Sequence, residues 1–565
     1  MKIYSYILLA LFSSQLISAP IVVTVGTDDD CDFQMVQSAV DSGAINMDIR
    51  VTNQLVIVEN ISILDGDEVI LLSGGYDNCL DASLGILDDF SPFTYFDGLN
   101  LDSVLSISIF NTNYFNISIS GFKIYNGLGG IIVTSGPANE TLIVNISYVD
   151  IYNNTSSAII GEGTGTEVSF NNGKIYDNSS FVGGGISCFE SELNLGENVA
   201  IYANLARQGG GIYARNCDVN ILAGDNNALD DLERGIFNNH ALDSGAGVYL
   251  NQTILVGLGP PAHPVSISGN TITDNQFSGL GGGVYMSSGS SMQMTNVRLD
   301  GNSATVAGGA IATMHDDIGL QSPSFFLIRN ENGCEYAEIC SSLSSNSISD
   351  NGYGSVIAQD GGGFGYVIQA SIKNNGSSNA MSLFKLKNSS QLLLSSDLIV
   401  SNSTALHLFD QEDESEVYIQ YSTLSDNVIT NYFNVQYDND NPQVLEVTGT
   451  IIKNGEATIA NLNNDNGNHD AQIKCSIVEN DDASGVVQNL SVAGDPSFVG
   501  NGNYKLKPNS IAIDRSCSNI GEFDIARYDI RNQDHNADGV ADLGAYEYID
   551  ADDVIYKNSF TQILK

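Results

Sequence analysis

The chain has 565 residues, of which 21 are basic and 67 are acidic, and its formal net charge is −46. This charge opposes binding to polyanions, so we expect no nucleic-acid partner and no contact with an anionic membrane surface. The chain contains 57 glycines and no tryptophan, and it is rich in Ile and Val. This composition favours short strands and tight turns over helices.

The amino terminus has the layout of a secretory signal peptide. Lys2 precedes an apolar run from Ile7 to Phe12, and small residues follow as far as Ser18 and Ala19. The apolar run is too short to cross a bilayer, and we expect no transmembrane span elsewhere. Residues 1–19 are therefore predicted to be removed on export, which places the mature protein outside the cell or on its surface.

A repeated pattern begins after residue 120, in which an apolar residue is followed three positions later by Asn. Successive Asn residues such as Asn154, Asn178 and Asn204 are 24 and 26 positions apart, so the period is roughly 25 residues. Gly127 takes the Asn position after Ile124, and Asn330 is a candidate for a missing member. The full series is Asn154, Asn178, Asn204, Asn239, Asn275, Asn302, Asn351, Asn375, Asn402, Asn427, Asn454 and Asn480.

Glycine triplets keep step with the Asn series. They begin five or six residues after an Asn, at Gly183, Gly209, Gly245, Gly281 and Gly308. Asn and Gly both tolerate the left-handed backbone conformation, so a turn repeated in every coil selects them, and stacked Asn side chains form hydrogen-bonded ladders. We expect both markers to be structural.

These observations predict an all-β fold, a single-stranded right-handed parallel β-helix of roughly 13 or more coils. A unit of this length with short β runs cannot bury its apolar residues alone, whereas stacked units share one core. We expect an amino-terminal cap with a short helix and the first coils in residues 20–95. The β-helix follows in residues 96–485, with a carboxy-terminal capping module in residues 486–548 and a tail in residues 549–565.

Eight cysteines in an exported chain are expected to be paired. Sequence proximity and the phase of the repeat predict four disulfides, which are Cys31 with Cys79, Cys188 with Cys217, Cys334 with Cys340, and Cys475 with Cys517. Metal binding is the competing interpretation, but no C-x-x-C pair and no neighbouring His supports it.

Two intervals of the repeat exceed the period by about ten residues, which places insertions at residues 225–234 and 251–264. A third segment, residues 314–323, carries His315, Asp316 and Asp317. If these insertions share one side of the rod, they frame a groove, and its further candidate residues are Asp230, Asp231, Glu233 and His263. Paired carboxylates in such a groove serve as general acid and base in glycoside hydrolysis. The alternative is that these acids are solvated loop charges.

The carboxy-terminal region carries four short blocks. They begin at Asp495 (DPSF), Tyr504 (YKL), Ser510 (SIAID) and Asp542 (DLGAYE). Together they look like the choice-of-anchor Q domain of exported bacterial right-handed parallel β-helix proteins. That resemblance implies export and surface display and no particular reaction. Gly308-Gly309-Ala310-Ile311 also resembles the repeat of polymorphic outer-membrane proteins, and the mode of anchoring stays open.

The segment from Asp534 to Asp542 has the spacing of a calcium loop. Asp534, Asn536, Asp538 and Asp542 supply side-chain oxygens at alternate or near-alternate positions, and Val540 would supply a backbone oxygen. Ala545 stands where an EF-hand carries its bidentate Glu, so Glu547 is the substitute donor. The site is therefore predicted to bind calcium, with a solvated acidic turn as the alternative.

Three functions remain open from the sequence. The first is an exported β-helix that binds an extracellular glycan or a neighbouring cell surface without catalysis, as an adhesin does. The second is a polysaccharide-degrading hydrolase or lyase that uses the loop carboxylates, and the third is a purely structural surface protein. No nucleophile elbow and no phosphate-binding loop is present in the sequence.

Overall fold

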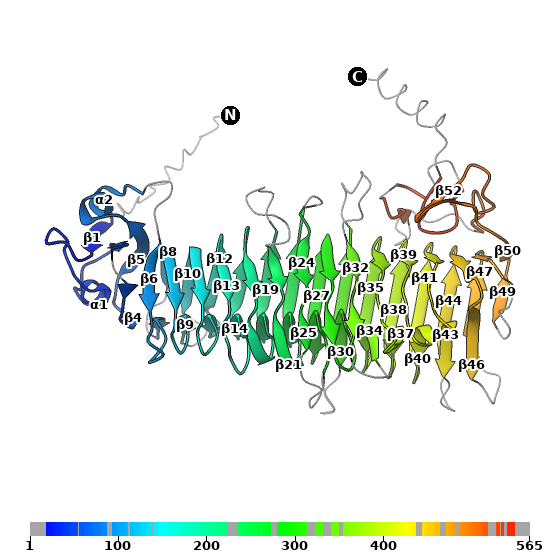
Figure 1. Ribbon diagram of the computed structural model, residues 1–565, viewed down its shortest axis with the longest axis horizontal. Coiled ribbons are helices and arrows are strands. Elements are labelled where there is room, and N and C mark those ends of the chain that lie inside the picture. Colours follow the sequence, from blue (N-terminus) through cyan, green and yellow to red (C-terminus); the bar gives the residue numbers. More distant parts are fainter. Residues whose placement is uncertain are drawn as a thin grey trace, which may run out of the picture.

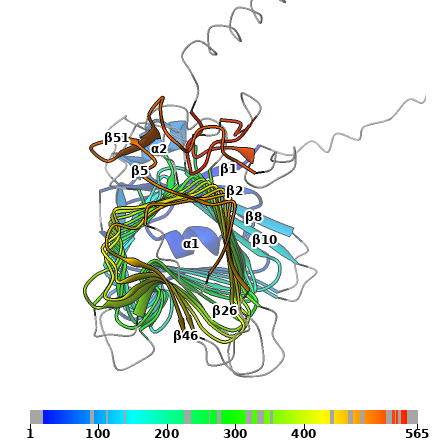
Figure 2. The same ribbon diagram turned by 90° about the vertical axis from the view of Figure 1, so that its right-hand side faces the viewer.

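In the computed structural model the chain winds into a long rod of stacked coils (Figure 1). Strands of successive coils pair in parallel and in register, which confirms the predicted all-β parallel β-helix. Viewed along the rod, the coils superimpose around one shared interior (Figure 2). The structure describes residues 19–54, 56–87, 93–110, 114–136, 140–223, 234–260, 263–272, 279–314, 323–330, 341–349, 354–436, 443–463, 470–480, 486–517, 527–531, 533–535 and 540–548.

One 31-stranded sheet forms two faces of the rod, which we call the first face and the second face. The first face contains β1 (Ile21–Val25), β2 (Met47–Thr52), β5 (Val69–Tyr76), the first halves of β8 (Tyr114–Tyr125) and β10 (Thr141–Tyr152), β12 (Thr166–Asn171), β15 (Glu192–Leu195), β19 (Asp218–Leu222), β23 (Ile254–Leu258), β27 (Ser291–Thr295), β31 (Phe325–Arg329), β35 (Phe364–Ile368), β38 (Gln391–Ser395), β41 (Glu416–Gln420), β44 (Val444–Thr448), β47 (Asp470–Lys474) and β49 (Val487–Asn489). The second face contains β3 (Val56–Ile57), β6 (Thr94–Asp97), the second halves of β8 and β10, β13 (Lys174–Tyr176), β16 (Ala200–Tyr202), β20 (Gly235–Phe237), β24 (Val265–Ser268), β28 (Val297–Asp300), β32 (Ser342–Ser344), β36 (Ser371–Lys373), β39 (Leu398–Val400), β42 (Thr423–Ser425), β45 (Ile451–Lys453), β48 (Ile477–Val478) and β50 (Val492–Ala493).

Two further sheets close the coil. A five-stranded sheet contains β17 (Leu205–Gln208), β21 (His240–Ser244), β25 (Thr271–Ile272), β29 (Ser303–Ala304) and β33 (Ser347–Ile348). A fourteen-stranded sheet contains β4 (Ile61–Ile63), β7 (Leu105–Ile109), β9 (Ile131–Ser135), β11 (Ile159–Glu162), β14 (Ile186–Phe189), β18 (Ile212–Arg215), β22 (Val248–Asn251), β26 (Val284–Ser287), β30 (Ile311–Met314), β34 (Gly354–Gln359), β37 (Ala380–Leu386), β40 (His407–Gln411), β43 (Asn431–Gln436) and β46 (Thr458–Asn463).

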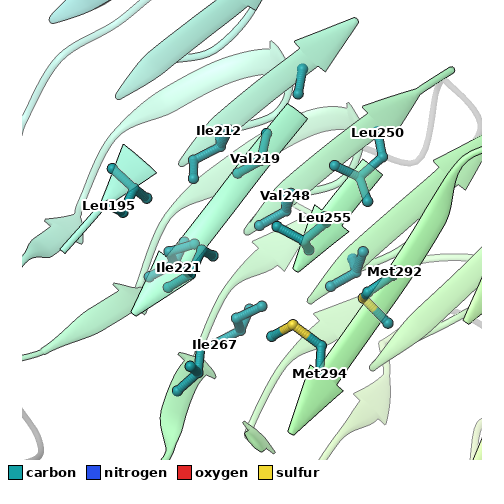
Figure 3. Close-up of a cluster of buried hydrophobic side chains, with 14 of the residues drawn as sticks. Leu195, Ile212, Val219, Ile221, Val248, Leu250, Leu255, Ile267, Met292 and Met294 are labelled. Carbon is teal, nitrogen blue, oxygen red and sulfur yellow. The ribbon is translucent and has the colours of Figure 1, made fainter. Parts of the chain in front are cut away.

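The core is a continuous column of aliphatic side chains inside the rod. Along each strand inward and outward residues alternate, as the pleat requires. Val219 and Leu255 from the first face meet Val248 and Leu250 from the fourteen-stranded sheet in this interior (Figure 3). Removal of this apolar surface from water is the main force that holds the coils together.

The amino-terminal end of the rod is closed by the predicted short helix, α1 (Val36–Val40). Val36, Ala39 and Val40 are fully buried, and the carboxylate of Glu59 accepts hydrogen bonds from the backbone N–H groups of Val36 and Gln37 at 2.8 and 3.0 Å. These bonds satisfy donors that the first turn of a helix leaves open. In Figure 2 α1 lies across the interior at the far end of the rod.

Three of the four predicted disulfides are confirmed, and Cys334 and Cys340 lie outside the described residues. Cys31 with Cys79 joins the first coil to α2 (Cys79–Leu84), Cys188 with Cys217 joins neighbouring coils, and Cys475 with Cys517 ties the last coils to the carboxy-terminal module. No cysteine of the described residues is free.

A ladder of Asn side chains runs along the corner between the second face and the five-stranded sheet. Each side-chain amide donates to the side-chain oxygen of the Asn in the next coil at 2.8–3.1 Å, and that oxygen also accepts the backbone N–H. Gly127 begins the ladder, because its N–H donates to Asn154. The members are Asn154, Asn178, Asn204, Asn239, Asn270, Asn302, Asn346, Asn375, Asn402 and Asn427.

The sequence prediction was wrong at several ladder positions. Asn270 and Asn346 occupy the places predicted for Asn275 and Asn351, which lie outside the described residues. Asn330 lies at another corner, where it donates to the backbone oxygen of Gln369. Asn454 and Asn480 follow the ladder but reverse it, since the backbone N–H of Asn480 donates to Asn454 at 3.1 Å.

The left-handed backbone of this turn also belongs to a different residue than expected. It is the residue before each ladder Asn that has a positive φ, for example Asp177, Ala203 and Asn238 at 54°, 54° and 52°. The Asn is therefore selected for its side-chain hydrogen bonds and not for its backbone conformation.

The glycine triplets lead into successive strands of the fourteen-stranded sheet. The first Gly of each triplet has a positive φ, such as 65° at Gly209. A Cβ at the second position, Gly210, would lie 2.4 Å from the carbonyl oxygen of His240 in the next coil. The triplets thus allow neighbouring coils to approach at a sharp bend, as the sequence predicts.

The corner between the first and second faces carries a ladder of short polar side chains. The N–H of Asp397 donates to the Ser422 hydroxyl at 3.1 Å, and the N–H of Ser422 donates to Thr450 at 3.4 Å. Asp397 itself is completely buried, and its two oxygens accept the N–H groups of Ala370 and Ser395. Burial raises the pKa of Asp397 well above its ordinary value.

The carboxy-terminal module packs on the side of the last coils, against the second face (Figure 1). Its hairpin of β51 (Phe498–Gly500) and β52 (Asn503–Leu506) contributes Tyr504, whose hydroxyl donates to Asp426 at 2.8 Å. Leu398, Val400, Ile451 and Ile477 point outward from the second face and are buried beneath the module. Strand stacking runs from β1 to β50, so the coils begin within residues 20–95 and, with β49 and β50, extend past residue 485, the predicted end of the β-helix.

We expect replacement of one ladder residue, Asn239→Ala, to lower the free energy of unfolding by about 2–4 kcal/mol, because it leaves the buried N–H and side-chain amide of Asn204 without their acceptor. Urea denaturation and amide exchange at Asn204 measure the effect. The control is Asn220→Ala on the solvent side of the first face. Water replaces the lost hydrogen bonds there, so the free energy of unfolding should fall by about 0.5 kcal/mol or less. Equal costs for the two variants would contradict a structural role for the ladder.

We expect Asp397→Ser, which installs the side chain found at the equivalent Ser422, to change the pH dependence of stability. A raised pKa means that this carboxyl holds its proton more tightly in the folded state than in the unfolded state. The contribution of Asp397 to stability is therefore greatest below the ordinary pKa of Asp, and it is lost as the pH rises through the raised value. The variant should therefore gain stability relative to the wild type between acidic and neutral pH. Melting curves of the variant and the wild type at acidic and at neutral pH test this. The same difference in melting temperature between the two proteins at both pH values would refute it.

Candidate functional site

The first face carries an aromatic patch on its middle coils. Outward-facing side chains alternate along each strand there with buried core residues. We define the aromatic patch as Phe325, Leu327, Phe364, Tyr366, Ile368, Leu393 and Tyr418, which are all half-buried. Parallel register aligns Phe325 with Phe364 and aligns Leu327, Tyr366, Leu393 and Tyr418 in a second row.

The rings of the aromatic patch are not stacked face to face. Phe325 and Tyr366 lie with ring centroids 5.6 Å apart and planes tilted by 49°, and Leu393 separates Tyr366 from Tyr418. Polar groups border the patch. The side-chain amides of Gln293, Gln391 and Gln420 form no hydrogen bond with any described residue. Half-buried rings next to uncommitted amides suit a ligand that is part apolar and part hydroxylated.

A tyrosine ladder on the second face differs from this patch. Tyr125, Tyr152, Tyr176, Tyr202 and Phe237 stack with centroids 4.9–5.3 Å apart and planes within 8°. Each interior ring is covered on both sides by its neighbours, so its edge and hydroxyl face the surroundings. The ladder therefore stabilises the stacking of coils, and it is a poor platform for a ligand ring.

The first face is acidic on β12, β15 and β19, which only β23 and β27 separate from the start of the aromatic patch at β31. Glu167, Glu192 and Asp218 stand at equivalent positions of β12, β15 and β19, and Asn194 donates to Glu167 and Glu192 at 3.0 and 3.2 Å. With Glu190 they line a surface hollow of about 560 Å³. In the parts of the chain that the structure describes, no three His, Cys, Asp or Glu side chains are arranged to hold a metal ion.

The insertions predicted to frame a groove do not share one corner. The insertion predicted at residues 251–264 is shorter than expected, because residues 254–258 form β23 and only residues 259–264 separate it from β24. Segments 224–233 and 259–264 join β19 to β20 and β23 to β24, so both connect the first face to the second. Segment 315–322 instead joins β30 of the fourteen-stranded sheet to β31 of the first face. The single wall predicted for all three is therefore wrong, because the third leaves from another corner. Asp230, Asp231, Glu233, His315, Asp316 and Asp317 lie outside the described residues.

The described residues at the ends of the first two insertions line one cavity, which we call the corner pocket. Its volume is about 120 Å³. Gly235 returns the chain to the second face with φ of +93°, and a Cβ there would lie 2.2 Å from the carbonyl oxygen of Ser266. The described lining consists of Leu195, Gly196, Asn198, Val199, Ile201, Ile221, Leu222, Ala223, Arg234, Gly235, Ile236, His263, Pro264, Val265, Ser266, Ser268, Arg298 and Asp300. His263, a predicted groove residue, is thus placed at a cavity.

The predicted calcium loop is described only at its ends, because Asn536 and Asp538 lie outside the described residues. Asp534 forms an ion pair with Arg527 at 3.1 Å, and Val540 is partly exposed. Asp542 is buried, and its two oxygens accept the N–H groups of Asp514 and Tyr548. Both described carboxylates are therefore engaged by protein groups, and calcium binding stays a prediction.

Ser396, His535 and Glu547 form a buried chain that the sequence did not reveal. The Ser396 hydroxyl lies 3.4 Å from Nε2 of His535, and Nδ1 of His535 lies 3.3 Å from Oε2 of Glu547. Burial lowers the pKa of His535 to about 3, so the imidazole is neutral and donates one hydrogen bond. This order resembles a hydrolase triad, but exposures of 0, 0 and 2% leave no path for a substrate. These three side chains instead fasten the carboxy-terminal module to the turn between β38 and β39.

No protein-family model matches the chain, and no curated protein matches it either. The resemblance of the four carboxy-terminal blocks to a choice-of-anchor domain is consequently carried by the motifs themselves. The described helices include none that is long and apolar enough to span a membrane. The three disulfides are compatible with an extracellular location.

We expect a calcium chelator to lower the melting temperature of the wild-type protein, because a cation bound only by the folded loop stabilises the folded state. Asp538→Asn should abolish the response by removing one predicted ligand. Differential scanning calorimetry with chelator, and with chelator plus excess calcium, measures it. An identical melting temperature in all conditions would remove the calcium site.

Proposed function

We propose that the protein is an exported surface β-helix that binds neutral glycans on its first face without cleaving them. The observation that carries this proposal is the aromatic patch, in which tilted, half-buried rings lie beside uncommitted Gln amides. Aromatic rings pack against the apolar side of a sugar ring, while amides bond its hydroxyl groups. The tyrosine ladder, by contrast, offers no uncovered interior ring.

The geometry of the rod favours an extended polysaccharide over a small sugar. Equivalent side chains recur in adjacent coils at the strand spacing of about 4.8 Å, so the patch presents similar contacts repeatedly along one axis. Several weak contacts made by one chain add to a useful affinity. The net charge of −46 disfavours acidic polysaccharides, which supports a neutral ligand.

The alternative is a polysaccharide-degrading enzyme that uses Asp231 or Asp316. Those residues lie outside the described part of the chain, so the two functions are distinguished by whether the protein releases products from a polysaccharide. New reducing ends or unsaturated products that disappear in Asp231→Asn or Asp316→Asn would establish the enzyme. A third alternative, a purely structural protein, requires neither retention nor turnover.

We expect the wild type to be retarded in affinity gels that contain neutral polysaccharides such as xylan or a soluble glucan, with no product released. The double variant Tyr366→Ala and Tyr418→Ala should weaken binding about tenfold, since each ring contributes about 0.5–1.5 kcal/mol. Tyr152→Ala, which removes a ring of the same type from the tyrosine ladder, is the matched control and should bind as the wild type does. Absence of retention by the wild type, or equal loss in the control, would reject the first face as the binding site.

A further inference from the structure

The corner pocket opens a gap in the wall of the core. Val199 and Ile221, which line it, are 8 and 7% exposed, whereas Val219, on the same strand as Ile221, is 1% exposed. Ala223 and Arg234, the described ends of the connection between β19 and β20, both line the pocket beside this wall. The apolar wall of the pocket is therefore core surface that the coils do not cover themselves.

Basic groups gather at the same pocket although they are scarce in the chain. Arg234, His263 and Arg298 all contribute to its lining, in a protein with 21 basic and 67 acidic residues. Arg298 lies on β28, and its side chain forms no ion pair or hydrogen bond with any described residue. A guanidinium beside an apolar wall is well suited to a carboxylate, which it binds through two parallel hydrogen bonds.

One acidic group, Asp300, also lines the pocket. It lies two residues after Arg298 on the same strand and accepts a hydrogen bond from the Ser344 hydroxyl at 2.7 Å. Asp300 partly offsets the positive potential of the arginines, so it limits the affinity for an anion and gives the pocket a second testable residue.

We propose that the corner pocket binds a small monocarboxylate with a compact apolar body, whose carboxylate pairs with Arg298 and whose apolar part lies against Val199 and Ile221. The proposal is independent of glycan binding on the first face. A volume of about 120 Å³ is close to that of apolar protein cavities that hold a benzene ring, about 150 Å³. The ligand is thus of the size of benzoate or a short branched fatty acid, and larger lipids are excluded.

Benzoate is the probe, and benzamide, which has the same shape without the charge, is the matched ligand. We expect calorimetry or ligand-observed NMR on the full chain to show benzoate binding at least about tenfold tighter than benzamide. Arg298→Gln should weaken benzoate binding by about the same factor, and Asp300→Asn should strengthen it. Lys373→Gln is the control, because it removes one positive charge from β36 on the same face outside the pocket.

A second variant tests the apolar wall. Ala223→Phe fills the pocket and should abolish the binding of both probes, while the melting temperature of each variant shows that it is folded. Equal affinities for benzoate and benzamide, or an unchanged affinity in Arg298→Gln, would overturn the pairing with Arg298. No binding of benzoate to the wild type up to millimolar concentration would overturn the site itself. Loss of glycan retention with benzoate binding intact would leave this proposal standing.

Discussion

The structure depends on exact repetition of position from one coil to the next. Parallel strands are joined by backbone hydrogen bonds that run along the rod, and every side chain lies above the equivalent side chain of its neighbour. A polar group placed in the interior must therefore find its partner in the adjacent coil. The Asn ladder meets this requirement, because the amide group donates and accepts at once and so can be repeated without an unsatisfied end.

The same repetition explains why the fold was predictable from sequence. Asn and Gly recurred in step, and a period near 25 residues left few architectures open. The ladder members were harder to identify, because one coil can contain the pattern twice. Ile267 with Asn270 and Ile272 with Asn275 both have the required spacing, and only the strand register selects Asn270. Local sequence also does not show that the left-handed residue precedes the Asn.

The candidate sites were less predictable because they depend on neighbours far apart in sequence. The rings of the tyrosine ladder had a local signal, because each directly follows the apolar residue of the Asn repeat, as Tyr152 follows Ile151. Tyr366 in the aromatic patch has no such marker, since the patch is formed by residues that meet only through the strand register. Ser396 and His535 are 139 residues apart and meet because the carboxy-terminal module folds back on the second face. The second insertion was predicted too long, because the interval was counted to Asn275 whereas the ladder member is Asn270. The corner from which each insertion leaves could not be read from length alone.

Mechanical behaviour follows from the disulfide between Cys188 and Cys217. In a rod of this kind, tension along the axis acts directly on the hydrogen bonds between coils, so an end coil can peel away while the others stay folded. The covalent link between Cys188 in β14 and Cys217, just before β19, carries such tension past the segment between them. Tension applied from the amino terminus therefore bypasses residues 189–216, which the disulfide shields from direct pulling.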